Sequence, residues 1–94
     1  MRLLIVEDEI SLAEALGELF GQDGYQTDIV YNGQDGLDYA LADIYDVIIL
    51  DIMLPRQNGL EVLHTLREKG IATPVLLLTA RSEEIGRASC RERV

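Results

Sequence analysis

Short runs of consecutive apolar residues recur along this chain, and they constrain its fold more than any other feature of the sequence. Three runs read LLIV, VIIL and VLLL, within the segments 2–6, 47–50 and 74–78. Residues 26–31 alternate apolar and polar side chains enough to form a further strand. Strands that are apolar without interruption are buried on both faces, as in parallel sheets covered by helices. The runs therefore predict an α/β fold with a parallel sheet between helical layers.

Segments with helical spacing separate the predicted strands. The first covers residues 11–20 and is followed by Gly21 and Gly24, which punctuate its end. The second begins near Asn32, and the third begins near Asn58. The apolar residues expected to share one face of each helix are Leu12, Leu16, Leu19 and Phe20, then Leu37, Ala40 and Leu41, then Leu60, Leu63 and Leu66. Strands that alternate with helices in this way indicate a doubly wound sheet with right-handed crossovers.

The length of 94 residues predicts a single domain, and the net charge of −9 makes that domain acidic. An acidic body argues against direct binding to nucleic acid by this segment, and it suits cations or basic partner surfaces. No apolar run approaches the roughly 18 residues of a membrane span, and no leader of the signal-peptide kind opens the chain. The single Cys90 cannot form an internal disulfide. We therefore expect a cytoplasmic location and no membrane partner.

Carboxylates follow two of the predicted strands at the point where each strand ends. Glu7 and Asp8 follow the first strand, and Asp51 follows the third. Open parallel sheets bind ligands where the strand order reverses, which in a 2-1-3-4-5 order lies between the first and third strands. Clustered carboxylates repel unless a cation lies among them, and oxygen ligands select Mg²⁺, or else Mn²⁺ or Ca²⁺. Met53 could add its main-chain carbonyl as a further metal ligand. A Mg²⁺ site with vacant positions can also bind a phosphate group. A carboxylate next to that phosphate can then act as the nucleophile.

A hydroxyl is predicted near the same crevice. Thr79 stands at the end of the fourth strand, where it could bond a phosphoryl oxygen, and Ala80 is small enough to leave an approach path. Taken alone, Thr79 is more simply explained as a β-branched strand residue.

Three stretches of the sequence, LLIVEDE, DVIILDIMLPRQNGLEVL and PVLLLTA, together resemble the receiver domain of two-component response regulators. The resemblance covers about residues 2–81 and includes the D-x-x-x-P-x-x-x-G pattern at Asp51, Pro55 and Gly59. Each stretch alone is a weak signal, but all three in order at their strand ends are specific. The segments VEDE and DIMLP are most similar to those of the OmpR-type subfamily, in which a winged-helix DNA-binding domain follows the receiver. The resemblance implies a flavodoxin-like receiver topology.

The resemblance also implies a role for each site residue. Asp51 would be the phosphoacceptor, taking a phosphoryl group from the phosphohistidine of a sensor histidine kinase. Asp8 would hold Mg²⁺ directly and Glu7 through water, and the main-chain carbonyl of Met53 would complete the protein ligands. Thr79 would bond the phosphoryl group and couple its arrival to a shift between two packings of the domain. The parent protein would be a homodimeric transcription regulator that binds DNA through another domain, and the receiver would not be a turnover enzyme.

The resemblance stops short of the end of the chain. We expect residues 1–82 to form a partial receiver domain and residues 83–94 to be a tail foreign to the family. The family continues with a helix, a fifth strand ending in Lys-Pro and a last helix, whereas the only lysine here, Lys69, ends the third predicted helix. From about Glu84 the sequence resembles vector-derived read-through, and a genuine short variant is the alternative.

Three other classes of protein share parts of this pattern. A Rossmann-type cofactor domain would need G-x-G-x-x-G after the first strand, where Glu7, Asp8 and Glu9 lie instead. A phosphohydrolase of the haloacid dehalogenase kind needs a second acid two residues after its aspartyl nucleophile, where Met53 cannot transfer protons. A receiver-like interaction module that is not phosphorylated would have no use for the intact acidic site. His64 is expected to have no acid that orients it, and we assign it no role in phosphoryl transfer.

Overall fold

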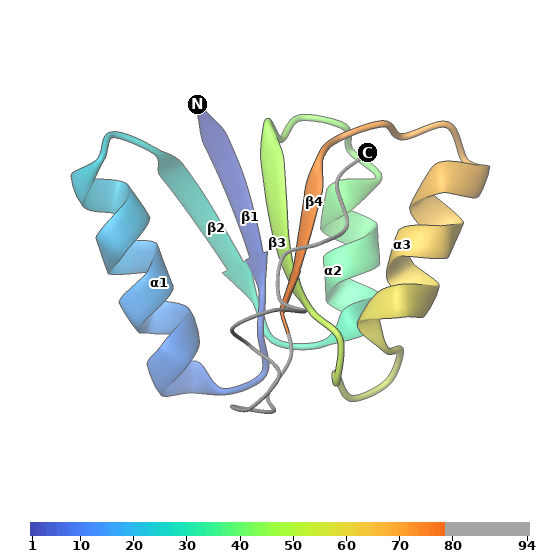
Figure 1. Cartoon of the computed structure of the whole chain (residues 1–94), viewed down its shortest axis with the longest axis horizontal. Helices are drawn as coiled ribbons and strands as arrows, with labels where there is room; N and C mark the ends of the chain where they lie inside the picture. The colour runs from blue at the N-terminus through green and yellow to red at the C-terminus, as the bar shows by residue number, and fades with distance from the viewer. Residues whose placement is uncertain (79–94) are drawn as a thin grey trace.

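The computed structural model of the chain describes residues 1–78, which form a parallel sheet with helices on both faces (Figure 1). The strands follow the order β2-β1-β3-β4, and every neighbouring pair is parallel. The elements in chain order are β1 (Arg2–Val6), α1 (Ile10–Gln22), β2 (Gln26–Val30), α2 (Gly33–Ala40), β3 (Val47–Asp51), α3 (Gly59–Glu68) and β4 (Val75–Leu78). The predicted doubly wound α/β fold is confirmed. None of the helices within residues 1–78 is both long enough and apolar enough to cross a membrane.

The apolar core lies in two layers, one on each face of the sheet. The larger layer joins the sheet to α2 and α3, and its buried residues include Leu4, Val6, Ile48, Leu50, Val62 and Leu66. The smaller layer joins the sheet to α1, and it contains Leu3, Ile5 and Ile49 with Leu16 and Phe20 packed against them. Successive residues of a strand point to opposite faces, so both layers draw on β1 and β3. Burial on both faces explains why the apolar runs of these strands are continuous.

Helix α1 buries only half of the predicted apolar face, since Leu16 and Phe20 pack against the sheet. Leu12 and Leu19 are 40% and 55% exposed, whereas Ala13 is fully buried. A Cβ added at Gly17 would lie only 2.9 Å from Cδ1 of Ile29 on β2. The helix therefore packs close to the sheet through its small residues, and this close approach turns two of its leucines toward solvent.

Three further details of the predicted elements are corrected. Gly21 lies inside α1 rather than ending it, and the chain leaves the helix at Gly24, whose φ is 93°. Asp51 is the last residue of β3 rather than the first residue beyond it, because it pairs in register with β4. On α3, Leu60 is 53% exposed and Val62 takes the buried position. The local sequence pattern thus predicted where each helix and strand lies. It did not always predict the residue at which an element ends or the face that packs against the core.

A polar cluster ties together the strands near their amino-terminal ends. The hydroxyl of Tyr45 donates to Oδ2 of Asp28 at 2.6 Å, and Nη2 of Arg2 lies 3.4 Å from the same oxygen. The backbone N–H of Arg2 donates to Oδ2 of Asp46 at 2.8 Å. Burial, together with the hydrogen bond to Asp28, raises the pKa of Tyr45 to about 12. The Tyr45 hydroxyl therefore keeps its proton and remains a donor at neutral pH.

Replacing Tyr45 with Phe should lower the free energy of unfolding by about 1–2 kcal/mol, because the Asp28 carboxylate would lose a buried donor. Tyr39→Phe is the matched control, since that side chain is 46% exposed. Urea unfolding followed by circular dichroism measures both variants. A Tyr45→Phe midpoint equal to that of the wild type would show that the bond to Asp28 adds nothing to stability.

Candidate functional site

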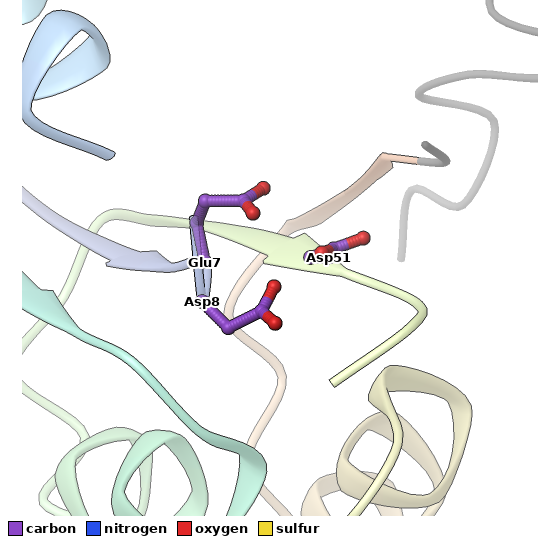
Figure 2. A group of neighbouring side chains, drawn as sticks. All are labelled: Glu7, Asp8 and Asp51. Atoms are coloured by element: carbon purple, nitrogen blue, oxygen red, sulfur yellow. The ribbon is translucent and has the colours of Figure 1, made fainter. Parts of the chain in front are cut away.

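Three carboxylates meet at the carboxyl ends of β1 and β3, where the strand order reverses (Figure 2). One oxygen atom from each of Glu7, Asp8 and Asp51 lies within 4.8 Å of the others. Glu7 and Asp51 are only 5% and 4% exposed, whereas Asp8 is open to solvent. The structure thus brings together the three acidic side chains that the sequence places at this crevice.

Strand register and two backbone donors set the geometry of the buried pair. The register in which β1 pairs with β3 places Glu7 beside Asp51. The N–H of Glu9 donates to Oε2 of Glu7 at 3.0 Å, and the N–H of Met53 donates to Oδ1 of Asp51 at 3.3 Å. Each buried carboxylate is therefore oriented by the backbone that immediately follows it.

The close packing of like charges disturbs the ionisation of the two buried acids. Burial, together with the negative charges of Asp51 and Asp8, raises the pKa of Glu7 to about 7, although the N–H of Glu9 opposes this shift. Burial also raises the pKa of Asp51, against the hydrogen bond from the N–H of Met53. The negative charge of Asp51 beside Glu7 is one cause of the raised pKa of Glu7, and it favours keeping a proton on Glu7. The cluster without a cation therefore retains part of a proton at neutral pH.

This set of donors fits a hard divalent cation. The three side chains offer only oxygen atoms, and Mg²⁺ needs few protein oxygens because it keeps several of its waters. A cation among the carboxylates would relieve the repulsion and displace the retained proton. The main-chain carbonyl of Met53 stays a predicted ligand, while the Met53 side chain is 62% exposed.

Glycine is required where α3 begins beside the end of β3. The N–H of Gly59 donates to the carbonyl oxygen of Ile52 at 2.8 Å, and a Cβ added at Gly59 would lie 2.3 Å from the carbonyl oxygen of Asp51. Asn58 caps the helix by accepting the N–H of Glu61 at 3.0 Å. This packing gives a physical reason for the glycine in the D-x-x-x-P-x-x-x-G pattern, since any side chain at that position would push α3 away from the acid.

Two other residues were singled out in the sequence, and only one of them lies in the part of the chain that the structure describes. Thr79 lies outside residues 1–78, so its contact with a phosphoryl group stays a prediction. The expectation that no acid orients His64 is wrong, because its Nε2 lies 3.1 Å from Oε2 of Glu68 one turn later on α3. Both side chains are largely exposed, and such surface pairs contribute little.

The sequence-based reasoning missed one contact that bears on the site. The N–H of Gly33, the first residue of α2, donates to the carbonyl oxygen of Pro55 at 3.2 Å, in the loop after Asp51. The only signal in the sequence is the Asn-Gly pair before the helix, which indicates a cap rather than a contact with a distant loop.

Comparison with known proteins assigns the chain to one family. The model of the response regulator receiver domain matches residues 3–92, and the chain belongs to that family. The transcriptional regulatory protein DltR of Streptococcus agalactiae is 52% identical over 83 residues, which cover 88% of this chain and 37% of DltR. The response regulator ArlR of Staphylococcus aureus is 48% identical over 82 residues, which cover 87% of this chain and 37% of ArlR. The chain therefore spans little more than a third of the length of these relatives.

Solved structures agree with this assignment. The receiver domain of the Francisella response regulator 1452 superposes with a TM-score of 0.81 at 27% identity, covering 97% of this chain and 79% of that chain. The response regulator TrrA of Thermotoga maritima, solved in complex with Mg²⁺-BeF, gives a TM-score of 0.80 at 37% identity, covering 93% of this chain and 76% of that chain. The predicted flavodoxin-like receiver topology is confirmed, and the family match decides against a Rossmann domain and a haloacid dehalogenase fold. The division of the chain at residue 82 stays a prediction.

Glu7→Gln should change how the stability of the metal-free protein depends on pH. The pKa of Glu7 is raised from 4.5 to about 7 on folding, so the folded state binds the extra proton between these values. Stability from this group is therefore complete below pH 4.5 and is lost as the pH rises through 7. Glutamine resembles the protonated acid at every pH. The variant should match the wild type at low pH and exceed its stability at about pH 8 by on the order of 1–3 kcal/mol.

Urea unfolding in a metal chelator, measured from about pH 4 to about pH 8, tests this pH dependence. Glu9→Gln is the control, because Glu9 is an exposed neighbour whose N–H, not its side chain, contacts Glu7. A difference between Glu7→Gln and the wild type that stays constant with pH would contradict the raised pKa.

Proposed function

We propose that this chain is a phosphoacceptor receiver domain in which Asp51 takes a phosphoryl group from the phosphohistidine of a sensor histidine kinase. The observation that carries the proposal is the buried carboxylate of Asp51 at the end of β3, beside the two acids that follow β1. The relatives support it because they are named as a response regulator and a transcriptional regulatory protein. The TrrA structure supports a role for Mg²⁺ in a domain of this fold, since it is a complex with Mg²⁺-BeF.

In the proposed reaction a carboxylate oxygen of Asp51 attacks the phosphorus, and the bond from phosphorus to the kinase imidazole breaks with its electron pair leaving on the imidazole. Asp8, Asp51, Glu7 through water and the main-chain carbonyl of Met53 would hold a Mg²⁺ ion, which would supply positive charge against the phosphoryl oxygens. The N–H of Met53 keeps Oδ1 of Asp51 oriented. A cation among the carboxylates would displace the proton that burial favours on Glu7.

Thr79 completes the proposed site. Its hydroxyl bonds the transferred phosphoryl group and couples its arrival to a shift between two packings of the domain. Support for this role comes from the Thr-Ala pair that follows the apolar run of β4 and from the family match, which includes this position. The domain thus acts as a regulated switch rather than as a turnover enzyme.

For the whole protein we propose a cytoplasmic, homodimeric transcription regulator that binds DNA through a winged-helix domain outside this chain. DltR is named a transcriptional regulatory protein, and the match covers only 37% of its length. The remainder of such a relative is long enough to hold a second domain, and the acidic receiver itself is poorly suited to DNA.

Addition of Mg²⁺ should raise the thermal midpoint of the chain, because an ion that binds only the folded state stabilises that state by mass action. At about 100 times the Kd the gain in the free energy of unfolding is about 2.7 kcal/mol. Asp8→Asn should remove most of this gain, whereas Glu9→Gln removes a neighbouring charge outside the cluster and should keep it. Differential scanning calorimetry with and without Mg²⁺ measures the shift of the thermal midpoint. A midpoint that does not change when Mg²⁺ is added would contradict the proposed metal site.

A small acyl phosphate supplied with Mg²⁺ should phosphorylate Asp51 alone. Mass spectrometry should find one hydroxylamine-sensitive phosphoryl group on the wild type and on Asp38→Asn, a control at an exposed position of α2, and none on Asp51→Asn. Equal labelling of Asp51→Asn would place the nucleophile elsewhere. A wild type that binds Mg²⁺ and is never labelled would instead be a receiver-like interaction module.

A further inference from the structure

The loop between β3 and α3, which follows Asp51, is hydrogen-bonded to the first turn of α2. No residue of α2 belongs to the carboxylate cluster. The carbonyl oxygen of Pro55 accepts two backbone N–H groups, from Gly33 at 3.2 Å and from Gln57 at 2.8 Å. Gly33 is buried, and a Cβ added there would lie 1.7 Å from the carbonyl oxygen of Gln57 and 2.6 Å from its carbonyl carbon. The first turn of α2 therefore touches the loop backbone directly, with no room for a side chain at residue 33.

The loop has an uncommon conformation at this contact. The hydrogen bond from Gln57 to Pro55 closes a three-residue γ-turn, and the residue at its centre, Arg56, has a φ of 74°. A γ-turn with positive φ is strained for a residue that carries a side chain. Strained backbone persists only where contacts with the surrounding structure stabilise it. The hydrogen bond from Gly33 to Pro55 is one such contact from outside the loop.

The strained turn lies next to the groups that orient the site. The N–H of Met53 holds Oδ1 of Asp51 at 3.3 Å, and the N–H of Leu54 donates to the carbonyl oxygen of Ile52 at 3.2 Å. Leu54 is buried and joins these groups directly to Pro55. A displacement of Pro55 would therefore move both the donor that orients Asp51 and the Met53 carbonyl.

We propose that Gly33 is a positioning residue for the phosphoacceptor site. Through its contact with Pro55 and Gln57, the first turn of α2 holds the loop after Asp51 in the geometry that binds the metal ion. This inference rests on the proposed function, because it concerns the same metal site.

Asn32 belongs to the same support. Its side-chain oxygen accepts the N–H of Asp35 at 2.8 Å and so caps the turn that presents Gly33 to the loop. Loss of this cap should loosen the turn without creating a clash, which makes Asn32→Ala a milder variant than Gly33→Ala.

The main test compares Gly33→Ala with Ala40→Gly, which weakens the buried last turn of the same helix. The backbone amide NMR signals of residues 52–54, 56 and 57 are recorded without metal and during a titration with Mg²⁺. We expect Gly33→Ala to displace these signals in the metal-free protein and to weaken Mg²⁺ binding about 10-fold, as loss of a support behind metal ligands does elsewhere. Ala40→Gly should leave the loop signals and the Mg²⁺ affinity as in the wild type.

If Gly33→Ala does not fold, Asn32→Ala is used as the test variant in its place. It should weaken Mg²⁺ binding in the same direction by a smaller factor, and Asn32→Ser, which keeps a capping oxygen, should restore it. Wild-type Mg²⁺ affinity in folded Gly33→Ala or in Asn32→Ala would overturn the inference. An equal loss of affinity in Ala40→Gly would also overturn it, because the stability of α2 and not its contact with the loop would then govern binding.

Failure of the proposed function gives a different result. If the wild type binds no Mg²⁺, the metal site is wrong, and the metal-free amide signals still decide whether Gly33 positions the loop. Displaced amide signals for residues 52–54, 56 and 57 in Gly33→Ala, with those of Ala40→Gly unchanged, support that role, and unchanged signals in Gly33→Ala refute it.

Discussion

The parallel pairing of β1 with β3 is the constraint on which the rest of the structure depends. Its register brings the acids that follow one strand beside the acid that ends the other, although more than forty residues of chain separate them. The same pairing buries both strands, so Glu7 and Asp51 lie in a place where water cannot screen their charges. Hydrogen bonds from backbone N–H groups offset only part of the cost of burying these charges. The pKa of Glu7 is therefore still raised. The fold thus holds like charges close together in a buried place, where a bound cation would offset their repulsion.

The arrangement of the acids could be predicted because each of its causes is local in the sequence. A continuous apolar run marks a buried strand, and an acid at the end of the run is visible as such. Helices between the runs require parallel strands, and parallel strands bring these ends to one edge of the sheet. The contrast between buried Glu7 and exposed Asp8 could not be predicted in this way, because the two are adjacent and differ only in the direction in which each side chain leaves the backbone.

The packing of the helices was harder to predict, because it depends on how closely two backbones approach. Leucine spacing favours one stripe of α1, but Ala13 and Gly17 let a neighbouring stripe come nearer to the sheet. The contact of Gly33 with the loop at Gln57 is non-local as well, and no periodicity encodes it. His64 shows the converse error, since Glu68 stands at the helical spacing that allows a pair and was overlooked.

The close approach of α1 to β2 has a consequence for how sequences of this kind can diverge. Ala13 is fully buried, and a Cβ at Gly17 would lie 2.9 Å from Cδ1 of Ile29, so a larger residue at either position would have to displace neighbouring side chains. Leu12 and Leu19 keep much of their surface in water and contribute correspondingly little to the core. In this chain, substitutions should therefore be tolerated better at Leu12 and Leu19 than at Ala13, the reverse of the order that hydrophobicity alone would give.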